Sequence, residues 1–174
     1  MLLNINNKTN ITLCGMMGSG KSSIGKILAN KLDYKFIDVD KMIEIKTKKT
    51  IIKIFEEDGE AYFRDLEEKI TINLLDNKET IVSLGGGAII NENIRNHIKK
   101  NSYNIYLEVD VDTLAKRLQN SKTRPLIYKK NLKKELIDLK KKREKFYKKA
   151  DLIIINEKNI IETTKKIINK ITYK

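Results

Sequence analysis

The sequence predicts an α/β protein in which a parallel sheet is covered by helices on both faces. Three observations predict it. Five short apolar runs alternate with segments of helical periodicity, a glycine-rich loop joins the first run to the first helix, and glycines or aspartates follow three of the runs. Parallel strands are buried on both faces and therefore appear as short apolar runs. Residues 1–174 have the length of one ordinary domain.

The expected elements follow one another with short connections. The strands are expected at residues 11–14, 34–37, 80–84, 103–109 and 152–155. Apolar residues at helical spacing predict helices at residues 21–32, 41–76 (interrupted near 46–49 and 59), 91–99, 112–120, 132–149 and 160–171. Residues 121–131 are polar and contain Pro125, which predicts a long loop that could act as a lid. In such folds ligands bind at the carboxyl ends of the strands.

Residues 15–22 fit the phosphate-binding pattern G-x-x-x-x-G-K-[ST] without a mismatch, between an expected strand and an expected helix. The glycines allow backbone N–H groups to surround phosphate oxygens, and the helix N-terminus adds a partial positive charge. Lys21 is expected to reach the β- and γ-phosphates of a nucleotide, and the Ser22 hydroxyl to coordinate Mg²⁺. The motif predicts binding of a nucleoside triphosphate without specifying the reaction.

Asp38 and Asp40 stand at the end of the second expected strand. If the strand continued through them, both carboxylates would point to one face, close to the phosphate loop. One could then order Mg²⁺ and its waters while the other accepts a proton from an alcohol. The alternative for Asp40 is that it caps the N-terminus of the following helix, which would not exclude catalysis.

The formal charge of +13 raises the question of a nucleic-acid partner. The excess is mostly lysine on expected helix faces, and aromatic side chains do not alternate with it as stacking platforms would. We therefore expect no functional nucleic-acid binding. Arginine is scarce, with five residues: Arg64, Arg95, Arg117, Arg124 and Arg143. Arginine can hold a carboxylate or phosphate with two parallel hydrogen bonds, so each position except Arg95, interpreted as a surface cation, is a candidate ligand-binding residue.

The chain has one cysteine, Cys14, which excludes an internal disulfide and follows an apolar run, so we expect a buried, inert thiol. No apolar run approaches the roughly 20 residues of a membrane span, and residues 1–10 lack the apolar core of a signal peptide. These features predict a cytoplasmic protein without a membrane partner.

The chain resembles the shikimate kinases over most of its length. The resemblance rests on motifs in the family's order and spacing: Gly15–Ser22, Asp38-Val39-Asp40, Phe63-Arg64, Gly85-Gly86-Gly87, Arg124-Pro125-Leu126 and Arg143. It implies the P-loop NTPase fold of the nucleoside-monophosphate-kinase type, a three-layer structure with strand order 2-3-1-4-5 and a lid. It also implies transfer of the γ-phosphate of ATP to the 3-hydroxyl of shikimate in aromatic amino-acid biosynthesis.

The resemblance also implies roles for individual residues. Catalysis would involve Asp40 as the base, Lys21, and the lid residue Arg124. The ATP site would comprise Gly18, Ser19, Gly20, Lys21, Ser22, Ser23, Arg117 and Arg124, with Mg²⁺ held by Ser22 and, through water, by Asp38. The shikimate site would comprise Asp40, Arg64, Gly85, Gly86, Gly87 and Arg143, with Glu67 bracing an arginine. The substrate-binding helical part is about residues 40–76, the lid about 121–131, and a monomer is expected.

Alternatives remain at this stage. On sequence alone, Arg64 could form an ion pair with Glu60, Glu67 or Glu68 on its own helix, and Arg143 could belong to a solvated basic face. Rival functions are another small-molecule kinase of the same fold, such as a gluconate kinase, and a nucleic-acid-binding P-loop NTPase. The family often has a proline after the fifth strand, whereas residues 157–160 have none, which leaves adenine contacts there open, with Lys158 as a weak candidate.

Overall fold

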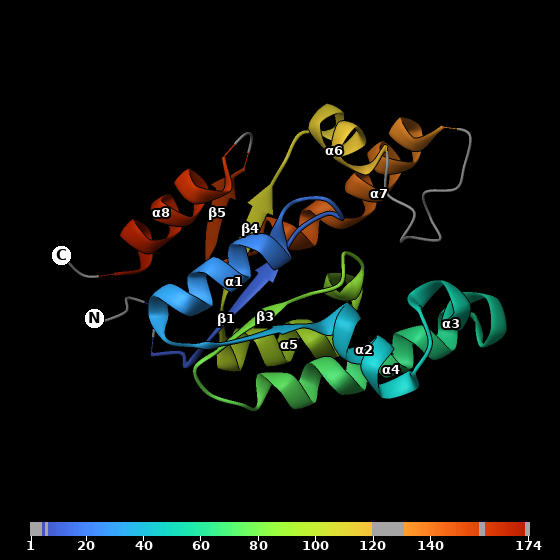
Figure 1. Ribbon diagram of the computed structural model, residues 1–174, viewed down its shortest axis with the longest axis horizontal. Coiled ribbons are helices and arrows are strands. Elements are labelled where there is room, and N and C mark those ends of the chain that lie inside the picture. Colours follow the sequence, from blue (N-terminus) through green and yellow to red (C-terminus); the bar gives the residue numbers. More distant parts are fainter. Residues whose placement is uncertain (1–4, 6, 120–130, 157–158, 173–174) are drawn as a thin grey trace.

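The protein is described by a computed structural model at residues 5, 7–119, 131–156 and 159–172. Its centre is one five-stranded sheet in the order β2-β3-β1-β4-β5, with every neighbouring pair parallel. The strands are β1 (Asn10–Cys14), β2 (Lys35–Asp38), β3 (Thr80–Ser83), β4 (Ser102–Glu108) and β5 (Leu152–Ile155). The expected strand order is confirmed, and the strand bounds agree with the expected runs within one or two residues (Figure 1).

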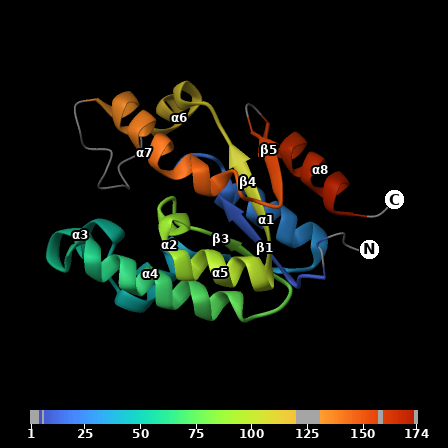
Figure 2. The same cartoon turned by 180° about the vertical axis from the view of Figure 1, so that it is seen from behind.

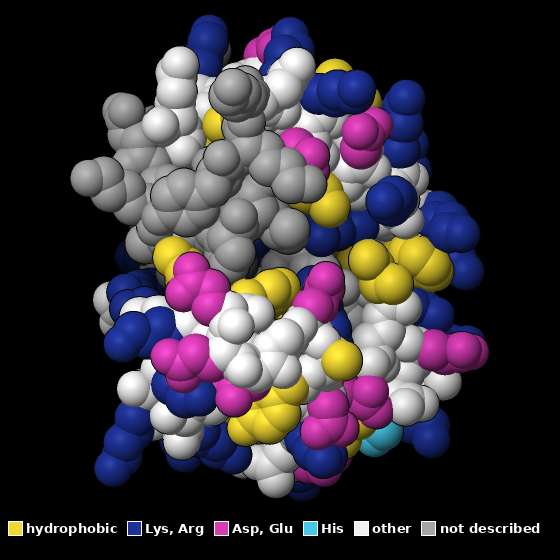
Figure 3. Space-filling model, turned by 90° about the vertical axis from the view of Figure 1, so that its right-hand side faces the viewer, with side chains coloured by type: hydrophobic (Ala, Val, Ile, Leu, Met, Phe, Trp, Pro, Cys, Tyr) yellow, Lys and Arg dark blue, Asp and Glu magenta, His cyan; other side chains and the backbone are white. Residues whose placement is uncertain are grey.

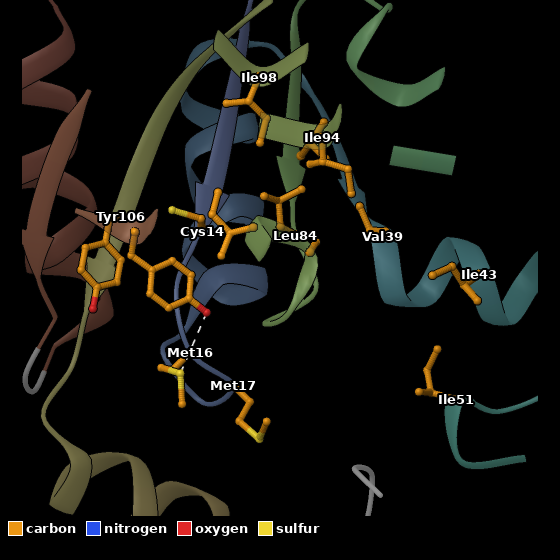
Figure 4. Close-up of a cluster of buried hydrophobic side chains, with 14 of the residues drawn as sticks. Cys14, Met16, Met17, Val39, Ile43, Ile51, Leu84, Ile94, Ile98 and Tyr106 are labelled. Atoms are coloured by element: carbon orange, nitrogen blue, oxygen red, sulfur yellow. Dashed lines mark hydrogen bonds between the residues drawn. The ribbon is translucent and has the colours of Figure 1, made fainter. Parts of the chain in front are cut away.

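Helices cover both faces of this sheet. On one face lie α1 (Lys21–Leu32) and α8 (Ile160–Ile171), which pack against each other. The opposite face, toward the viewer in Figure 2, carries α4 (Gly59–Leu75), α5 (Glu92–Asn101) and α7 (Leu132–Tyr147). Successive side chains along a strand point alternately into these two layers. In β1, Ile11 and Leu13 pack with the α1 and α8 side chains, while Cys14 packs in the other cluster, shown in Figure 4.

Between β2 and β3 the chain forms α2 (Val39–Thr47), α3 (Ile51–Glu57) and α4, and these three helices pack against one another. The expected interruptions are confirmed, because α2 ends before Lys48 and α4 begins at Gly59. Strand β2 does not continue through Asp40, since α2 begins at Val39. The N-cap is Asp38, whose carboxylate accepts a hydrogen bond from the Lys41 backbone N–H at 3.3 Å, so the capping alternative for Asp40 is wrong.

The remaining short elements lie at the carboxyl ends of the strands. The turn after β3 leads into the 3₁₀ helix η1 (Ala88–Ile90), and α6 (Val111–Leu118) follows β4. The expected lid loop at 121–131 lies outside the described residues except for Asn131, which caps α7 through its side chain. The carboxyl ends of β1, β2 and β3 therefore bring together the phosphate loop, the aspartate pair and the glycine turn, as expected for this sheet.

Within the described part of the chain, no helix is both long enough and apolar enough to cross a membrane. The formal net charge of the chain is +13. On the face drawn in Figure 3, acidic side chains lie among the basic ones. Cys14 is 1% exposed, and burial raises the pKa of its thiol to about 12, so the expected inert thiol is confirmed.

Candidate active site

The phosphate loop connects β1 to α1 and lines an open pocket with an empty volume of about 930 Å³. Its lining residues are Gly18, Gly20, Lys21, Ser22, Ser23, Asp38, Asp40, Ser83, Leu84, Arg117, Asn156 and Ile160. Lys21 is 7% exposed, and its ammonium donates hydrogen bonds to the carbonyl oxygens of Gly15 and Met16 at 2.9 and 3.0 Å. The cation therefore lies across the loop whose N–H groups are expected to hold phosphate oxygens.

A hydroxyl and a carboxylate meet at the first turn of α1. Ser22 Oγ donates a hydrogen bond to Asp38 Oδ2 at 2.5 Å. Oxygen donors of these two kinds are the ones that Mg²⁺ prefers, and Mg²⁺ usually takes few protein ligands because phosphates and waters complete its shell. The described residues contain no group of three or more acidic, histidine or cysteine side chains arranged for a metal. Ser22 and Asp38 therefore fit a magnesium ion bound together with a nucleotide.

A second, smaller pocket lies beside the first. It is lined by Met17, Asp40, Ile51, Phe55, Phe63, Arg64, Glu67, Gly85, Gly86, Gly87 and Arg143. The charged and backbone groups are those selected from the sequence, and the apolar wall comes from α3 and α4. Asp40 lines both pockets, so its carboxylate stands where a phosphate donor and an acceptor would meet.

Arg143 enters the acceptor pocket from α7 and is 3% exposed, so the solvated-face alternative is wrong. Its Nε and Nη1 are buried and have no hydrogen-bond partner among the described residues. Two buried guanidinium nitrogens without hydrogen-bond partners are costly, because their N–H groups have lost water without gaining an acceptor. An anionic ligand with two oxygens would satisfy both nitrogens with parallel hydrogen bonds.

Arg64 enters the same pocket from α4. Its Nη1 donates to Glu67 Oε2 at 2.6 Å, and its Nη2 donates to Glu60 Oε1 at 3.1 Å. The ion-pair alternative is thus correct for Glu60 and Glu67, and it does not remove Arg64 from the pocket. The pKa of the Glu67 carboxyl is raised, because the effect of its burial exceeds the opposing effect of the nearby Arg64 charge. A nearly buried Glu67 therefore holds the Arg64 guanidinium in position.

The glycine turn after β3 passes close to the side chains of the acceptor pocket. A Cβ on Gly87 would lie 2.7 Å from Arg64 Nη1. A Cβ on Gly85 would collide with Glu67 Oε1 and lie 2.9 Å from Asp40 Oδ1. Glycine permits this close approach of backbone to side chains, so the turn can present its peptide groups to a ligand alongside Asp40 and Arg64.

The remaining predicted nucleotide contacts are only partly described. Arg117 lines the phosphate pocket and donates to the carbonyl oxygens of Gly18 at 3.1 Å and Asn156 at 3.3 Å. Ser19, also predicted to bind ATP, is a completely buried residue of the loop. Arg124 and Lys158 lie outside the described residues, so the predicted lid contact and the adenine candidate remain predictions.

Sequence reasoning missed Asn156, which is fully buried and donates from Nδ2 to the carbonyl oxygen of Ser19 at 2.7 Å. Its only sequence signal was a polar residue directly after a strand. Arg95, interpreted as a surface cation, is half-buried and makes contacts that the sequence did not indicate. Its Nη1 donates to the carbonyl oxygens of Ile89 and Ile90, and its guanidinium lies 4.4 Å from the centre of the Phe146 ring. Arg95 thus joins η1 to α7 instead of standing free on the surface.

Comparison with known proteins gives one consistent result. The family model described as shikimate kinase matches residues 17–172. A shikimate kinase from Persephonella marina is 45% identical over 85% of this chain and 89% of its own, and one from Bartonella henselae is 40% identical over 94% and 77%. The solved structure of shikimate kinase from Acinetobacter baumannii in complex with shikimate superposes with a TM-score of 0.91 at 34% identity, covering 95% of this chain and 94% of the other.

Proposed function

This chain belongs to the shikimate kinase family, and from that premise we propose that it transfers the γ-phosphate of ATP to the 3-hydroxyl of shikimate. The observation that carries the proposal is Arg143. Its two buried guanidinium nitrogens, unpartnered within the described residues, face a small pocket that shares Asp40 with the phosphate pocket. A small polyol acid supplies what this pocket lacks, namely a carboxylate for the arginine and hydroxyls for the aspartate.

Each part of the acceptor would meet a different wall of the pocket. The carboxylate would bind Arg143 and the outer edge of Arg64, the hydroxyls would face Asp40 and the glycine turn, and the ring would lie against the aromatic side chains Phe55 and Phe63. The rings of these two phenylalanines pack against each other with their centres 4.8 Å apart. This arrangement favours a ring with one anionic end over an unbranched acceptor.

The chemical step needs a base at the junction of the two pockets. Asp40 accepts the proton of the acceptor hydroxyl as its oxygen forms a bond to the γ-phosphorus, and the bond from that phosphorus to the β-γ bridging oxygen breaks. Lys21 and the phosphate loop hold the phosphoryl oxygens and stabilise the charge that shifts onto the leaving ADP. Arg124 would add a further cation from the lid.

Ser22 and Asp38 would hold Mg²⁺ with the nucleotide, Asp38 through water. The ion supplies positive charge that neutralises the phosphate oxygens. We also propose that the protein acts as a monomer on dissolved small molecules in the cytoplasm, with no nucleic-acid or membrane partner.

A panel assay tests the function. ADP release is measured with ATP and, in turn, shikimate, gluconate, nucleoside monophosphates and single-stranded nucleic acid, and the product is identified by phosphorus NMR. Of these acceptors, we expect only shikimate to be turned over, and we expect the phosphate on its 3-hydroxyl. Turnover with gluconate but not shikimate would favour the gluconate kinase alternative, and nucleic-acid-stimulated hydrolysis would favour the nucleic-acid-binding one.

A further inference from the structure

Tyr147, on the last turn of α7, has no role in the chemistry described above, yet it contacts the acceptor site from behind. Its side chain is completely buried. Its hydroxyl donates a hydrogen bond to the carbonyl oxygen of Gly86 at 2.5 Å, in the middle of the glycine turn. The same hydroxyl lies 3.9 Å from Met16 Sδ in the phosphate loop, the contact dashed in Figure 4. One phenol group therefore touches both the acceptor turn and the phosphate loop.

The ring of Tyr147 also has a defined packing partner. It stacks on Tyr106 of β4 with ring centres 4.9 Å apart and an angle of 11° between the planes. Burial raises the pKa of the Tyr147 hydroxyl, so it remains a hydrogen-bond donor throughout the neutral range. Because α7 turns once every 3.6 residues, Tyr147 and Arg143 share one face of the helix. The helix that supplies Arg143 is thus anchored to the sheet one turn further along.

The bond to Gly86 fixes the direction of a peptide group. In a trans peptide the carbonyl oxygen of one residue and the N–H of the next point in opposite directions. With its carbonyl oxygen held by Tyr147, Gly86 forces the N–H of Gly87 to point away from Tyr147. Gly87 lines the acceptor pocket, and the position of a Cβ on Gly86 would be 3.5 Å from Arg143 Nη1. A change in the orientation of the glycine turn would therefore also change the surroundings of the Arg143 guanidinium.

We propose that Tyr147 is a positioning residue that acts through Gly86 and Arg143 to shape the acceptor pocket. It does not line that pocket, which is why it is not a catalytic residue. Arg95 supports the same turn from its other end, by binding η1 and packing on Phe146, the residue before Tyr147. The inference rests on the proposed function, because the ligand that the turn receives is the shikimate of that proposal.

The test compares Tyr147→Phe with Tyr106→Phe. Each loses one hydroxyl from the same buried stack, but of the two only Tyr147 bonds to the glycine turn. A lost hydrogen bond to a buried carbonyl corresponds to roughly a fivefold to tenfold effect. We expect Tyr147→Phe to raise the KM for shikimate by about that factor and to leave the KM for ATP within about twofold. Tyr106→Phe should leave both KM values near those of the wild type.

Two further readouts separate this role from general support of the fold. The ¹⁵N–¹H resonance of Gly87 should shift in Tyr147→Phe but not in Tyr106→Phe, and it needs no turnover. The effects of Tyr147→Phe and Arg143→Lys on the KM for shikimate should be less than additive, because both loosen one contact. The inference would be overturned if Tyr147→Phe changed neither the KM for shikimate nor the Gly87 resonance. It would also be overturned if Tyr147→Phe and Tyr106→Phe changed them equally. A wild type inactive on shikimate would instead overturn the proposed function, and the Gly87 comparison would still decide the role of Tyr147.

Discussion

Lys21 and Arg143 are two nearly buried cations that serve different anions. Lys21 offers a compact ammonium beside the carbonyl oxygens of the phosphate loop, where several phosphate oxygens can share it. Arg143 offers a planar fork with two unpartnered nitrogens within the described structure, which suits a single carboxylate. Asp40 lies between them, on the boundary of the two pockets. The chemistry at this site therefore separates into phosphate, hydroxyl and carboxylate contacts that substitutions can test one at a time.

Replacing Lys21 by alanine should lower kcat by about 100-fold or more, because a preorganised charge at a transferring phosphoryl group contributes ~3 kcal/mol to the transition state. The matched control is Lys26→Ala, which removes an exposed lysine from the same helix. Steady-state kinetics with saturating ATP and shikimate measures both variants. A kcat for Lys21→Ala within threefold of the control would show that the phosphate loop does not hold the transferred group.

Replacing Asp40 by asparagine keeps the size of the side chain and removes the proton acceptor. General base catalysis contributes about 10²- to 10⁴-fold, so kcat should fall by at least 100-fold while the KM for shikimate changes much less. Asp65→Asn, at an exposed position on α4 that pairs with Lys69, is the control. If Asp40→Asn mainly raised the KM for shikimate and kept kcat, Asp40 would be a binding group without a role as base.

At the scale of elements, the phosphate loop is supported by a strand that lies far from it in sequence. Asn156 follows β5 and donates to Ser19 of the loop, while its Oδ1 accepts a hydrogen bond from Thr163 of α8 at 2.9 Å. The point where a Cβ on Gly20 would sit is 2.9 Å from Asn156 Nδ2. The edge strand and the last helix thus help to fix the shape of the loop that begins α1.

Asn156→Asp should weaken nucleotide binding, because it replaces a donor to the Ser19 carbonyl oxygen by a carboxylate oxygen and adds negative charge beside the phosphates. A buried acceptor left without its donor costs about 1–3 kcal/mol, so we expect the KM for ATP to rise roughly tenfold with a smaller change in the KM for shikimate. Asn96→Asp, at an exposed position on α5, adds the same charge elsewhere. Equal ATP KM values in the two variants would contradict the supporting role of Asn156.

The elements themselves were largely predictable. Apolar runs of four to seven residues identified the strands, and helical spacing identified the helices, because both patterns reflect which faces are buried. Which of Asp38 and Asp40 caps α2 was left open, because at this point a strand passes directly into a helix and either aspartate could cap it. The position of the lid remains a prediction, because residues 120–130 are not described.

Residues of the candidate site were predictable only where a local sequence pattern or an unusual residue type pointed to them. The phosphate loop has a local pattern, and the scarcity of arginine drew attention to Arg143. Asn156 and Tyr147 had no such pattern, because each acts on a backbone carbonyl 137 or 61 residues away in sequence. The contacts of Arg95 were not predicted for the same reason, since its partner Phe146 belongs to another helix. Contacts of this kind follow from the packing of the whole sheet.

For the whole molecule, Cys14 provides an internal probe of that packing. The thiol lies at the end of the central strand β1 and is 1% exposed. Burial raises its pKa to about 12, so in the folded state it carries a proton at neutral pH and is a poor nucleophile. Reaction with an exposed-thiol reagent such as dithionitrobenzoate should therefore require the protein to open.

We expect one thiol equivalent to react at once in urea and only slowly in buffer, with a further slowing when ATP and shikimate are added, because ligands that bind the folded state lower the open population. Lys21→Ala is the control in which added ATP should slow the reaction less. Immediate reaction of the folded protein would show that the layer of helices over Cys14 is not closed.

Recognition of the acceptor through its carboxylate distinguishes the proposed shikimate kinase from a kinase that acts on a neutral alcohol. The most direct measurement compares kcat/KM for shikimate and for its methyl ester in the wild type and in Arg143→Lys. A bidentate charged contact of ~2–3 kcal/mol predicts that the wild type prefers the acid by roughly 30- to 150-fold, and that Arg143→Lys loses most of this preference while its KM for ATP is unchanged. If the wild type phosphorylated the ester as readily as the acid, Arg143 would not recognise the acceptor through its carboxylate.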